Sequence, residues 1–155
     1  MNEYMKIAKE LSDDNLKTNV GGPFGACIVK DGKIIGKGSN HVLANNDPTA
    51  HAEIMAIRDA CKNIKSYDLS GAELYTSCYP CPMCLSAIIW ANIKNVFYVN
   101  TREDAYMIGF RYDDIYEYIE EGIRDNKTIK LKQINRAETI KVFEEYMKKN
   151  DKTIY

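Results

Sequence analysis

Hydrophobic and polar residues recur along the chain with two periods, one typical of helices and one typical of strands. Tyr4, Ile7 and Leu11 lie at helical spacing among charged neighbours, which predicts an amphipathic helix. Residues 24–30 predict a strand, and Asp31-Gly32 is a strong signal for a hairpin turn. The predicted elements are, in order, a helix over 3–17, strands over 24–30 and 33–38, a helix over about 49–62, a strand over 73–77, a helix over 82–90, a strand over 95–99, a helix over 113–121, an extended piece over 128–131, and a helix over 137–149.

The order of these elements is typical of an α/β protein. Strands joined by a tight turn pair antiparallel, whereas two strands joined through a helix pair in parallel. The sequence therefore predicts a mixed sheet with helices packed on it. We expect Asp47 or Thr49 to cap the helix that follows the loop over 45–48.

Size and composition restrict the classes of protein to which the chain can belong. It has 155 residues, of which 45% are hydrophobic and 28% charged, as expected for one folded domain. The net charge is −1, which does not favour a strong general affinity for nucleic acid or an anionic membrane. The N-terminal residues lack an apolar signal core, and no apolar stretch is long enough to span a bilayer. We expect one cytoplasmic domain over residues 1–155.

Five cysteines are unusual enough to require an explanation. The count is odd and no signal core precedes them, so a framework of disulfides is not expected. Cys78, Cys81 and Cys84 fall within seven residues, and such clusters in cytosolic proteins are usually metal-binding or catalytic. Cys27 and Cys61 lie in other predicted elements and are interpreted as small buried residues.

Two short motifs contain the residue types of a zinc site. They are His51-Ala52-Glu53 and Pro80-Cys81-Pro82-Met83-Cys84, each predicted at a junction between a loop and a helix. A helix N-terminus favours thiolates, and Cys81 and Cys84 are close enough in sequence to bind one ion. Histidine with two thiolates suits Zn²⁺ and leaves a fourth position open for water. The motifs predict zinc on His51, Cys81 and Cys84, with Glu53 as a proton carrier.

Two other interpretations of the cysteines remain open at this point. With Cys78 as a fourth ligand, the same residues would form a closed structural zinc site without catalysis. A redox-active pair of Cys81 and Cys84 is the second alternative. Both interpretations leave Glu53 without a purpose, so the catalytic site is the preferred hypothesis.

Longer segments around these motifs resemble the cytidine-deaminase-like superfamily and, within it, the small bacterial guanine deaminases. The combination of H-x-E with P-C-x-x-C is the signature of zinc deaminases. The segments that carry the resemblance are Gly21–Ala26, Asn46–Glu53, Tyr75–Cys78 with Pro80–Cys84, and the weaker Gly109-Phe110 and Ile115-Tyr116.

The resemblance implies a three-layer α/β/α sandwich with a mixed central sheet. It implies zinc on the three named ligands and Glu53 as proton shuttle. It also implies that Asn40 and the backbone at Ala52 contact the substrate base, with Phe24 and Trp90 near its ring. The implied assembly is a homodimer that exchanges the segment from about residue 110 to the C-terminus, so that Tyr155 closes the pocket of the partner.

The chain departs from the family pattern at two places. Tyr79 stands before Pro80-Cys81 where the family usually has a glutamate that is not a ligand. The family also places an acidic pair directly after Gly-Phe, and one of these carboxylates reads the guanine edge. Here Arg111-Tyr112 follows, so Tyr112 takes that position unless a rearranged loop brings Asp113 or Asp114 to it. The two aspartates would equally suit the N-terminus of a helix.

The preferred function is hydrolytic deamination of a nucleobase or nucleoside, with guanine giving xanthine and ammonia as the leading reaction. Deamination of cytosine, cytidine, adenine or guanosine is an alternative within the same chemistry. A tRNA adenosine deaminase shares both motifs, but the near-neutral charge favours a small-molecule substrate over RNA. A non-catalytic zinc domain is the third hypothesis.

Overall fold

The computed structural model describes residues 2–124 and 127–155, and it divides into two compact units. The first unit ends at Glu117, and the second covers Tyr118–Tyr155. In the described part of the chain, no helix combines the length and the apolar character needed to cross a membrane.

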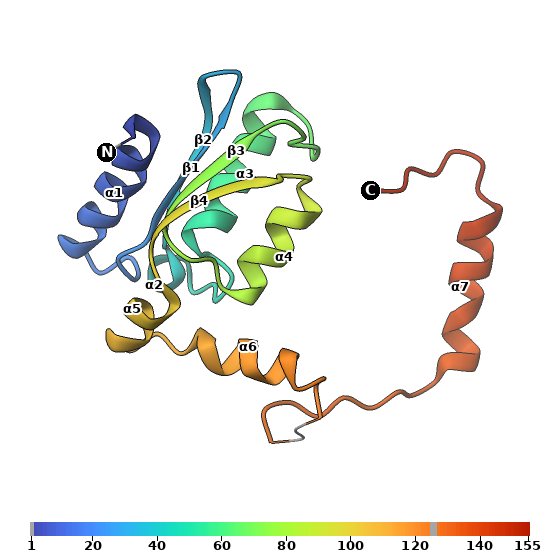
Figure 1. The fold of residues 1–155 in the computed structure, drawn as a ribbon. Coiled ribbons are helices and arrows are strands. Elements are labelled where there is room, and N and C mark those ends of the chain that lie inside the picture. The colour runs from blue at the N-terminus through green and yellow to red at the C-terminus, as the bar shows by residue number, and fades with distance from the viewer. Residues whose placement is uncertain (1, 125–126) are drawn as a thin grey trace. The chain divides into compact units, whose positions relative to one another are not determined.

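The first unit is built on a four-stranded mixed sheet (Figure 1). The strands are β1 (Gly25–Lys30), β2 (Lys33–Ser39), β3 (Glu73–Cys78) and β4 (Asn95–Asn100), in the spatial order β2-β1-β3-β4. Strand β1 pairs antiparallel with β2 and β3, whereas β3 and β4 pair in parallel. The predicted hairpin and the predicted parallel pairing are therefore confirmed.

Helices cover both faces of this sheet because the residues of β1 are apolar on both sides. Cys27 and Val29 pack with Met5 and Ala8 of α1 (Glu3–Leu16) on one face. Ala26 and Ile28 belong to the cluster on the other face, which includes residues of two longer helices. Those helices are α3 (Ala52–Ile64) and α4 (Pro82–Trp90). This alternation has the period of two that a strand imposes. The fold is the predicted three-layer α/β/α sandwich (Figure 1).

The predicted cap of α3, Asp47 or Thr49, is wrong, and the true start of the helix affects the site. Asp47 does not cap the helix, because its carboxylate accepts hydrogen bonds from the backbone N–H and the hydroxyl of Thr49. These local hydrogen bonds hold the Asp47 carboxylate within the loop, so it does not cap the N-terminus of a helix. The cap of α3 is His51, two residues beyond Thr49, so the histidine lies at the helix end that faces the thiolates.

Four further helices complete the structure. Two short ones, α2 (Val42–Asn45) and α5 (Arg102–Met107), were not predicted. Helix α6 (Tyr112–Glu120) begins in the first unit, and α7 (Arg136–Lys148) lies in the second. Both agree with the predicted helices to within one residue. Residues 128–131, predicted as an extended piece, belong to no helix or strand.

Candidate active site

Three side chains with metal-binding atoms meet where two helices begin. His51 is the N-cap of α3, Cys81 is the N-cap of α4, and Cys84 lies in the first turn of α4. Nδ1 of His51 is 3.5 Å from Sγ of Cys81 and 3.5 Å from Sγ of Cys84. All three donor atoms lie within 4.8 Å of one another. Among the described residues, no other group of three such side chains meets this criterion.

These distances fit a tetrahedral zinc ion. Zn–N and Zn–S bonds of about 2.0 and 2.3 Å at the tetrahedral angle separate the two donor atoms by about 3.5 Å. The observed distances from Nδ1 to the two sulfur atoms have this value. Because Nδ1 faces the sulfur atoms, Nε2 is the nitrogen that would carry the ring proton.

The electrostatic environment favours one thiolate even without a cation. A hydrogen bond from the Cys84 thiol, together with His51, lowers the pKa of Cys81 to about 4. The same interaction and burial raise the pKa of Cys84, so the pair shares one proton. A hydrogen bond with Cys81 raises the pKa of His51. A divalent cation would replace the shared proton, as expected for a site that binds metal through thiolates.

Cys78 does not join this group. Its sulfur lies 3.1 Å from Oη of Tyr112 and donates to the carbonyl oxygen of Thr101 over 3.4 Å. A site closed by four protein ligands is therefore not formed in this structure. The three donors leave the fourth tetrahedral position open, which is the arrangement of catalytic zinc sites.

Glu53 lies beside the metal-binding group, in the first turn of α3. Its side chain is buried, and Oε1 accepts a hydrogen bond from the hydroxyl of Thr76 over 3.0 Å. Burial raises the pKa of Glu53, while the hydrogen bonds from its own backbone, Cys84 and Thr76 oppose this shift. A carboxyl group with a raised pKa can both accept and return a proton near neutral pH.

His51, Glu53 and Cys81 face a cavity of about 410 Å³ in the first unit. Its other lining residues are Gly21, Gly22, Phe24, Asn40, Val42, Leu43, Pro48, Cys78, Tyr79, Phe110 and Tyr112. The volume falls in the range of small-molecule sites, and the lining combines aromatic walls with few polar groups. Phe24 and Phe110 meet edge to face, with ring centroids 4.8 Å apart.

Asn40 is a buried polar residue on the cavity wall. Oδ1 of Asn40 accepts a hydrogen bond from the backbone N–H of Val42 over 3.1 Å. The backbone carbonyl oxygen of Asn40 accepts one from Nδ2 of Asn15 over 2.8 Å. A side chain at Gly21 would clash with Asn40, so the glycine is required here. With Oδ1 occupied, the Nδ2 amide is the group that Asn40 offers to a ligand.

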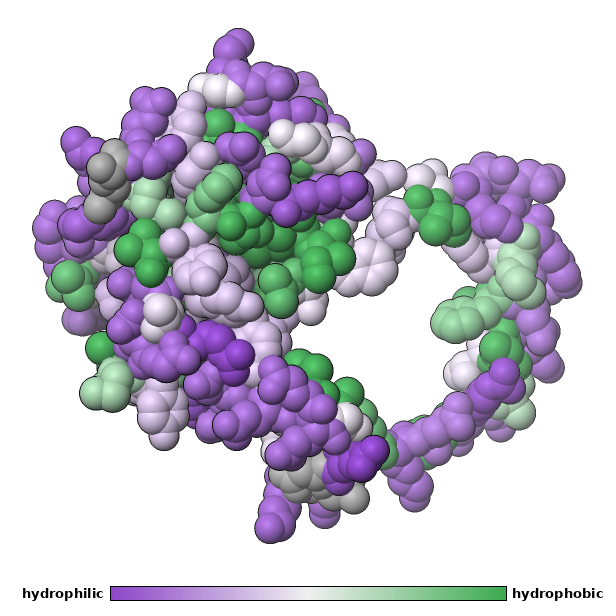
Figure 2. Space-filling view, in the orientation of Figure 1, coloured by the Kyte–Doolittle hydropathy of each residue, from purple (hydrophilic) through white to green (hydrophobic). Residues whose placement is uncertain are grey.

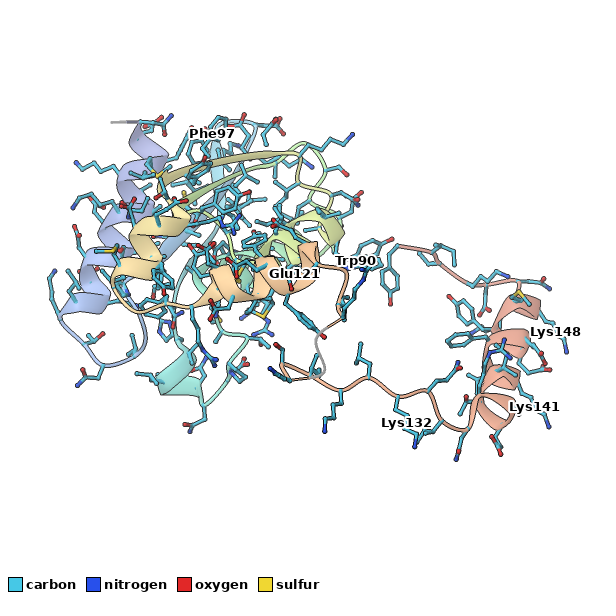
Figure 3. All side chains as sticks on the ribbon, turned by 60° about the horizontal axis from the view of Figure 1, so that its bottom comes forward. Trp90, Phe97, Glu121, Lys132, Lys141 and Lys148 are labelled. Carbon is cyan, nitrogen blue, oxygen red and sulfur yellow. The ribbon has the colours of Figure 1, made fainter. Side chains whose placement is uncertain are left out.

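Five of the residues implied as substrate contacts are not among the lining residues. Ala52 is buried at the start of α3, and Trp90 ends α4 with 65% of its surface exposed (Figure 3). Asp113 forms an ion pair with Arg102, at 2.5 Å from Nη2. The other two are Asp114, in the first turn of α6, and Tyr155, in the second unit.

Several lining residues were not identified from the sequence, including Val42, Leu43, Pro48 and Phe110. Val42 and Leu43 belong to α2, a helix too short to show a periodic pattern. Phe110 was visible only as part of the short Gly109-Phe110 match.

Comparison with known proteins assigns the chain to a family. A model of the cytidine and deoxycytidylate deaminase zinc-binding region matches residues 1–100. The chain belongs to this family. The matched region includes His51, Glu53, Cys81 and Cys84, and the chain is a zinc-dependent aminohydrolase.

Relatives within this deaminase family include enzymes named for two substrates. The guanine deaminase of Bacillus subtilis (strain 168) is 47% identical over 91% of this chain and 90% of its own length. The tRNA-specific adenosine deaminase of Buchnera aphidicola subsp. Schizaphis graminum is 38% identical over 81% of this chain and 80% of its own.

Solved structures give the same result. The crystal structure of Bacillus subtilis guanine deaminase superposes with a TM-score of 0.92 and 44% identity, covering 100% of this chain and 99% of that one. The guanine deaminase of Nitrosomonas europaea superposes with a TM-score of 0.67 and 33% identity, covering 70% of this chain and 63% of that one. The chain is thus a homologue of guanine deaminases.

Proposed function

We propose that this protein hydrolyses guanine to xanthine and ammonia. The observation that carries the proposal is the position of the buried Glu53 carboxyl group beside an open three-ligand zinc site, at a cavity with aromatic walls. The similarity to two guanine deaminases supports the choice of substrate. We propose further that residues 1–155 act as one deaminase domain, because the Bacillus subtilis relative aligns over 91% of the chain.

Zinc held by His51, Cys81 and Cys84 would activate a water molecule for attack on the ring carbon that bears the amino group. The protein would supply the proton transfers and the orientation of the base. We propose that Glu53 takes a proton and returns it first to a ring nitrogen and then to the departing amine. The hydroxyl of Thr76 holds one oxygen of Glu53, which fixes the direction from which the proton moves.

Two sets of residues would orient the flat ring. Nδ2 of Asn40 is placed to donate a hydrogen bond to an acceptor on the base. Phe24 lies on the cavity wall with Phe110 packed against it and would contact the face or edge of the ring. Aromatic walls of this kind exclude water while leaving the recognition of polar atoms to a few groups.

The edge of the base opposite the metal would meet Tyr112 instead of a carboxylate. The hydroxyl of Tyr112 donates to the carbonyl oxygen of Tyr79 over 3.0 Å, so it is already engaged as a donor. Asp113 is paired with Arg102, and Asp114 lies outside the lining residues. We therefore expect weaker discrimination between guanine and related rings than a carboxylate would give, since an unmatched polar edge lowers specificity.

Ammonia release by the zinc-loaded protein tests the proposed reaction and its substrate. We would compare guanine, guanosine, adenine, adenosine, cytosine and cytidine at equal concentrations and expect guanine to give the highest kcat/KM. Failure to release ammonia from every one of these compounds would contradict a nucleobase or nucleoside deaminase. A higher kcat/KM for another compound would correct the substrate and leave the reaction class intact.

Deamination of adenosine in tRNA is the second candidate, because a tRNA-specific adenosine deaminase is among the relatives. Helix α7 of the second unit offers little support for an RNA-binding surface. Lys148 of α7 pairs with Glu145 at 2.7 Å, and Lys141 lies on the same helix among glutamates (Figure 3). Inosine formation in a tRNA stem-loop at a higher kcat/KM than guanine turnover would replace our proposal.

We also propose a homodimer that exchanges C-terminal segments. Each unit exposes large hydrophobic side chains, which mark interaction surfaces. In the first unit these include Ile89 of α4, and Figure 2 shows hydrophobic residues gathered over this helix. In the second unit they include Val142 and Phe143 of α7.

The free thiols required by the zinc site support a cytoplasmic location.

A further inference from the structure

Two hydroxyl groups on one helix donate hydrogen bonds to consecutive carbonyl groups of the loop before the zinc ligands. Oη of Tyr112 donates to the carbonyl oxygen of Tyr79 over 3.0 Å. Oη of Tyr116 donates to the carbonyl oxygen of Pro80 over 2.6 Å. The two tyrosines are four residues apart on α6, so their side chains share one face of the helix.

We propose that Tyr112 and Tyr116 are positioning residues that orient the zinc ligand Cys81. The inference rests on the zinc site of the proposed function. Cys81 follows Pro80 directly and has an extended backbone as the N-cap of α4. A rotation of either preceding peptide group would therefore displace its sulfur atom from His51 and Cys84. Hydrogen bonds to both carbonyl groups fix these two peptide planes.

The face of α6 that carries the tyrosines is itself anchored to the first unit. Arg102 forms an ion pair with Asp113, and its guanidinium group lies 4.1 Å from the centre of the Tyr116 ring. On the other side, the Tyr79 ring packs edge to face against Tyr98, with centroids 5.0 Å apart. The loop is thus held through its backbone by α6 and through a side chain by β4.

The two tyrosines differ in their relation to the cavity. Tyr112 lines the cavity, and its hydroxyl also lies 3.1 Å from the sulfur of Cys78. Tyr116 is not among the lining residues, so a substrate would not contact it. A change at Tyr116 should therefore act through the metal, whereas a change at Tyr112 should act through both the metal and the substrate.

The test compares Tyr112→Phe and Tyr116→Phe, which remove one hydroxyl each and keep the ring. Tyr4→Phe is the matched control, because Oη of Tyr4 donates to the carbonyl oxygen of Gly32 over 3.1 Å, away from the zinc site. The measurements are the rate of zinc transfer to a chelator, the absorption spectrum of the cobalt-substituted protein, and the melting temperature of the zinc-free protein.

We expect zinc release about 3- to 10-fold faster in each α6 variant than in the wild type, as one lost hydrogen bond would produce. The cobalt spectrum should change in both α6 variants, and Tyr4→Phe should match the wild type in both readouts. Tyr116→Phe should leave KM unchanged, whereas Tyr112→Phe should alter it.

Three outcomes would overturn the inference. Release rates and cobalt spectra equal to those of the wild type would show that the hydroxyls do not position Cys81. Equally fast release from Tyr4→Phe would show general loosening instead of a local effect. Failure of the wild-type protein to take up zinc would overturn the proposed function as well. The first two outcomes would overturn only the positioning role of the tyrosines.

Discussion

Glu53 is the residue on which the proposed chemistry depends most. Its carboxyl group is buried, and burial alone favours the neutral acid. Hydrogen bonds from the Glu53 backbone, Cys84 and the hydroxyl of Thr76 favour the ionised form and oppose this effect. The balance between them decides at which pH Glu53 can accept a proton.

Thr76→Val removes one of these hydrogen bonds without a large change in shape. The pKa of Glu53 should rise, because the lost donor stabilised the charged form. Turnover that requires the ionised carboxylate should then fall off on the acidic side at a higher pH than in the wild type. We expect kcat near neutral pH to fall about tenfold. Thr76→Ser keeps the hydroxyl and serves as the control in the pH profile of kcat.

The cysteines give a second prediction for single residues. Cys84→Ala removes a donor atom from the metal-binding group and should abolish stoichiometric zinc binding. Cys78→Ala should keep one zinc per chain, because the sulfur of Cys78 faces Thr101 and Tyr112 instead of the metal. Elemental analysis of the purified variants measures both. Zinc loss in Cys78→Ala would support the closed four-ligand site.

At the scale of elements, the close approach of β2 and α3 fixes where His51 and Glu53 lie. Gly36 and Gly38 face the helix, and a Cβ atom at either would be 2.5 Å from a backbone oxygen of α3. Glycine at these positions lets the helix lie directly on the strand. The N-terminal end of α3, with both functional residues, is thereby set relative to the sheet.

Gly38→Ala should therefore destabilise the protein. The new Cβ atom would force the strand and the helix apart, at a cost of about 1–3 kcal/mol in the free energy of unfolding. Lys37→Ala changes the exposed neighbour on the same strand and should cost less than about 0.5 kcal/mol. Denaturant unfolding of both variants makes the comparison, and equal stabilities would contradict the close packing as a constraint.

The elements with a strong local pattern could be predicted from the sequence, and those without one could not. The hairpin at Asp31-Gly32 and the helix after Pro82 have explicit turn and cap signals, and the structure confirms both. Helices α2 and α5 have four and six residues, which is too short for a periodic signal. Asp47 and Thr49 resemble caps but bond to each other, which only the folded loop reveals.

The residues of the candidate site also differ in how well the sequence could predict them. The proposed zinc ligands lie in two compact motifs, so the sequence predicts them without knowledge of their positions in the fold. The hydrogen bond from Tyr112 to Tyr79 joins residues 33 positions apart, and no local pattern predicts it. The same holds for the pair of Thr76 and Glu53, which are 23 positions apart and meet because α3 packs on the sheet that contains β3.

At the scale of the whole molecule, the proposed exchange of C-terminal segments would make each site depend on two chains. Residues up to Glu117 contain the proposed zinc ligands and the cavity, whereas Tyr155 lies in the second unit. In such an exchange, Tyr155 would act on the pocket of the partner. A Tyr155→Ala variant should therefore lose activity without losing zinc.

Mixing two inactive variants tests this exchange directly. Glu53→Gln chains keep Tyr155, and Tyr155→Ala chains keep Glu53, so a mixed dimer would contain one complete site. We expect activity to return after the two are unfolded and refolded together, up to about one quarter of the wild-type level for random pairing. No recovery in a mixture that forms dimers, shown by light scattering, would contradict the exchange.

The proposed function depends on proton transfer by Glu53 at a zinc site that deaminates guanine. The most direct measurement is the formation of xanthine and ammonia from guanine by wild-type and Glu53→Gln protein, with the zinc content of each determined on the same sample. We expect one zinc per chain in both and a loss of at least about 100-fold in kcat for Glu53→Gln. Near-normal turnover by Glu53→Gln, or loss of its zinc, would contradict the role assigned to this residue.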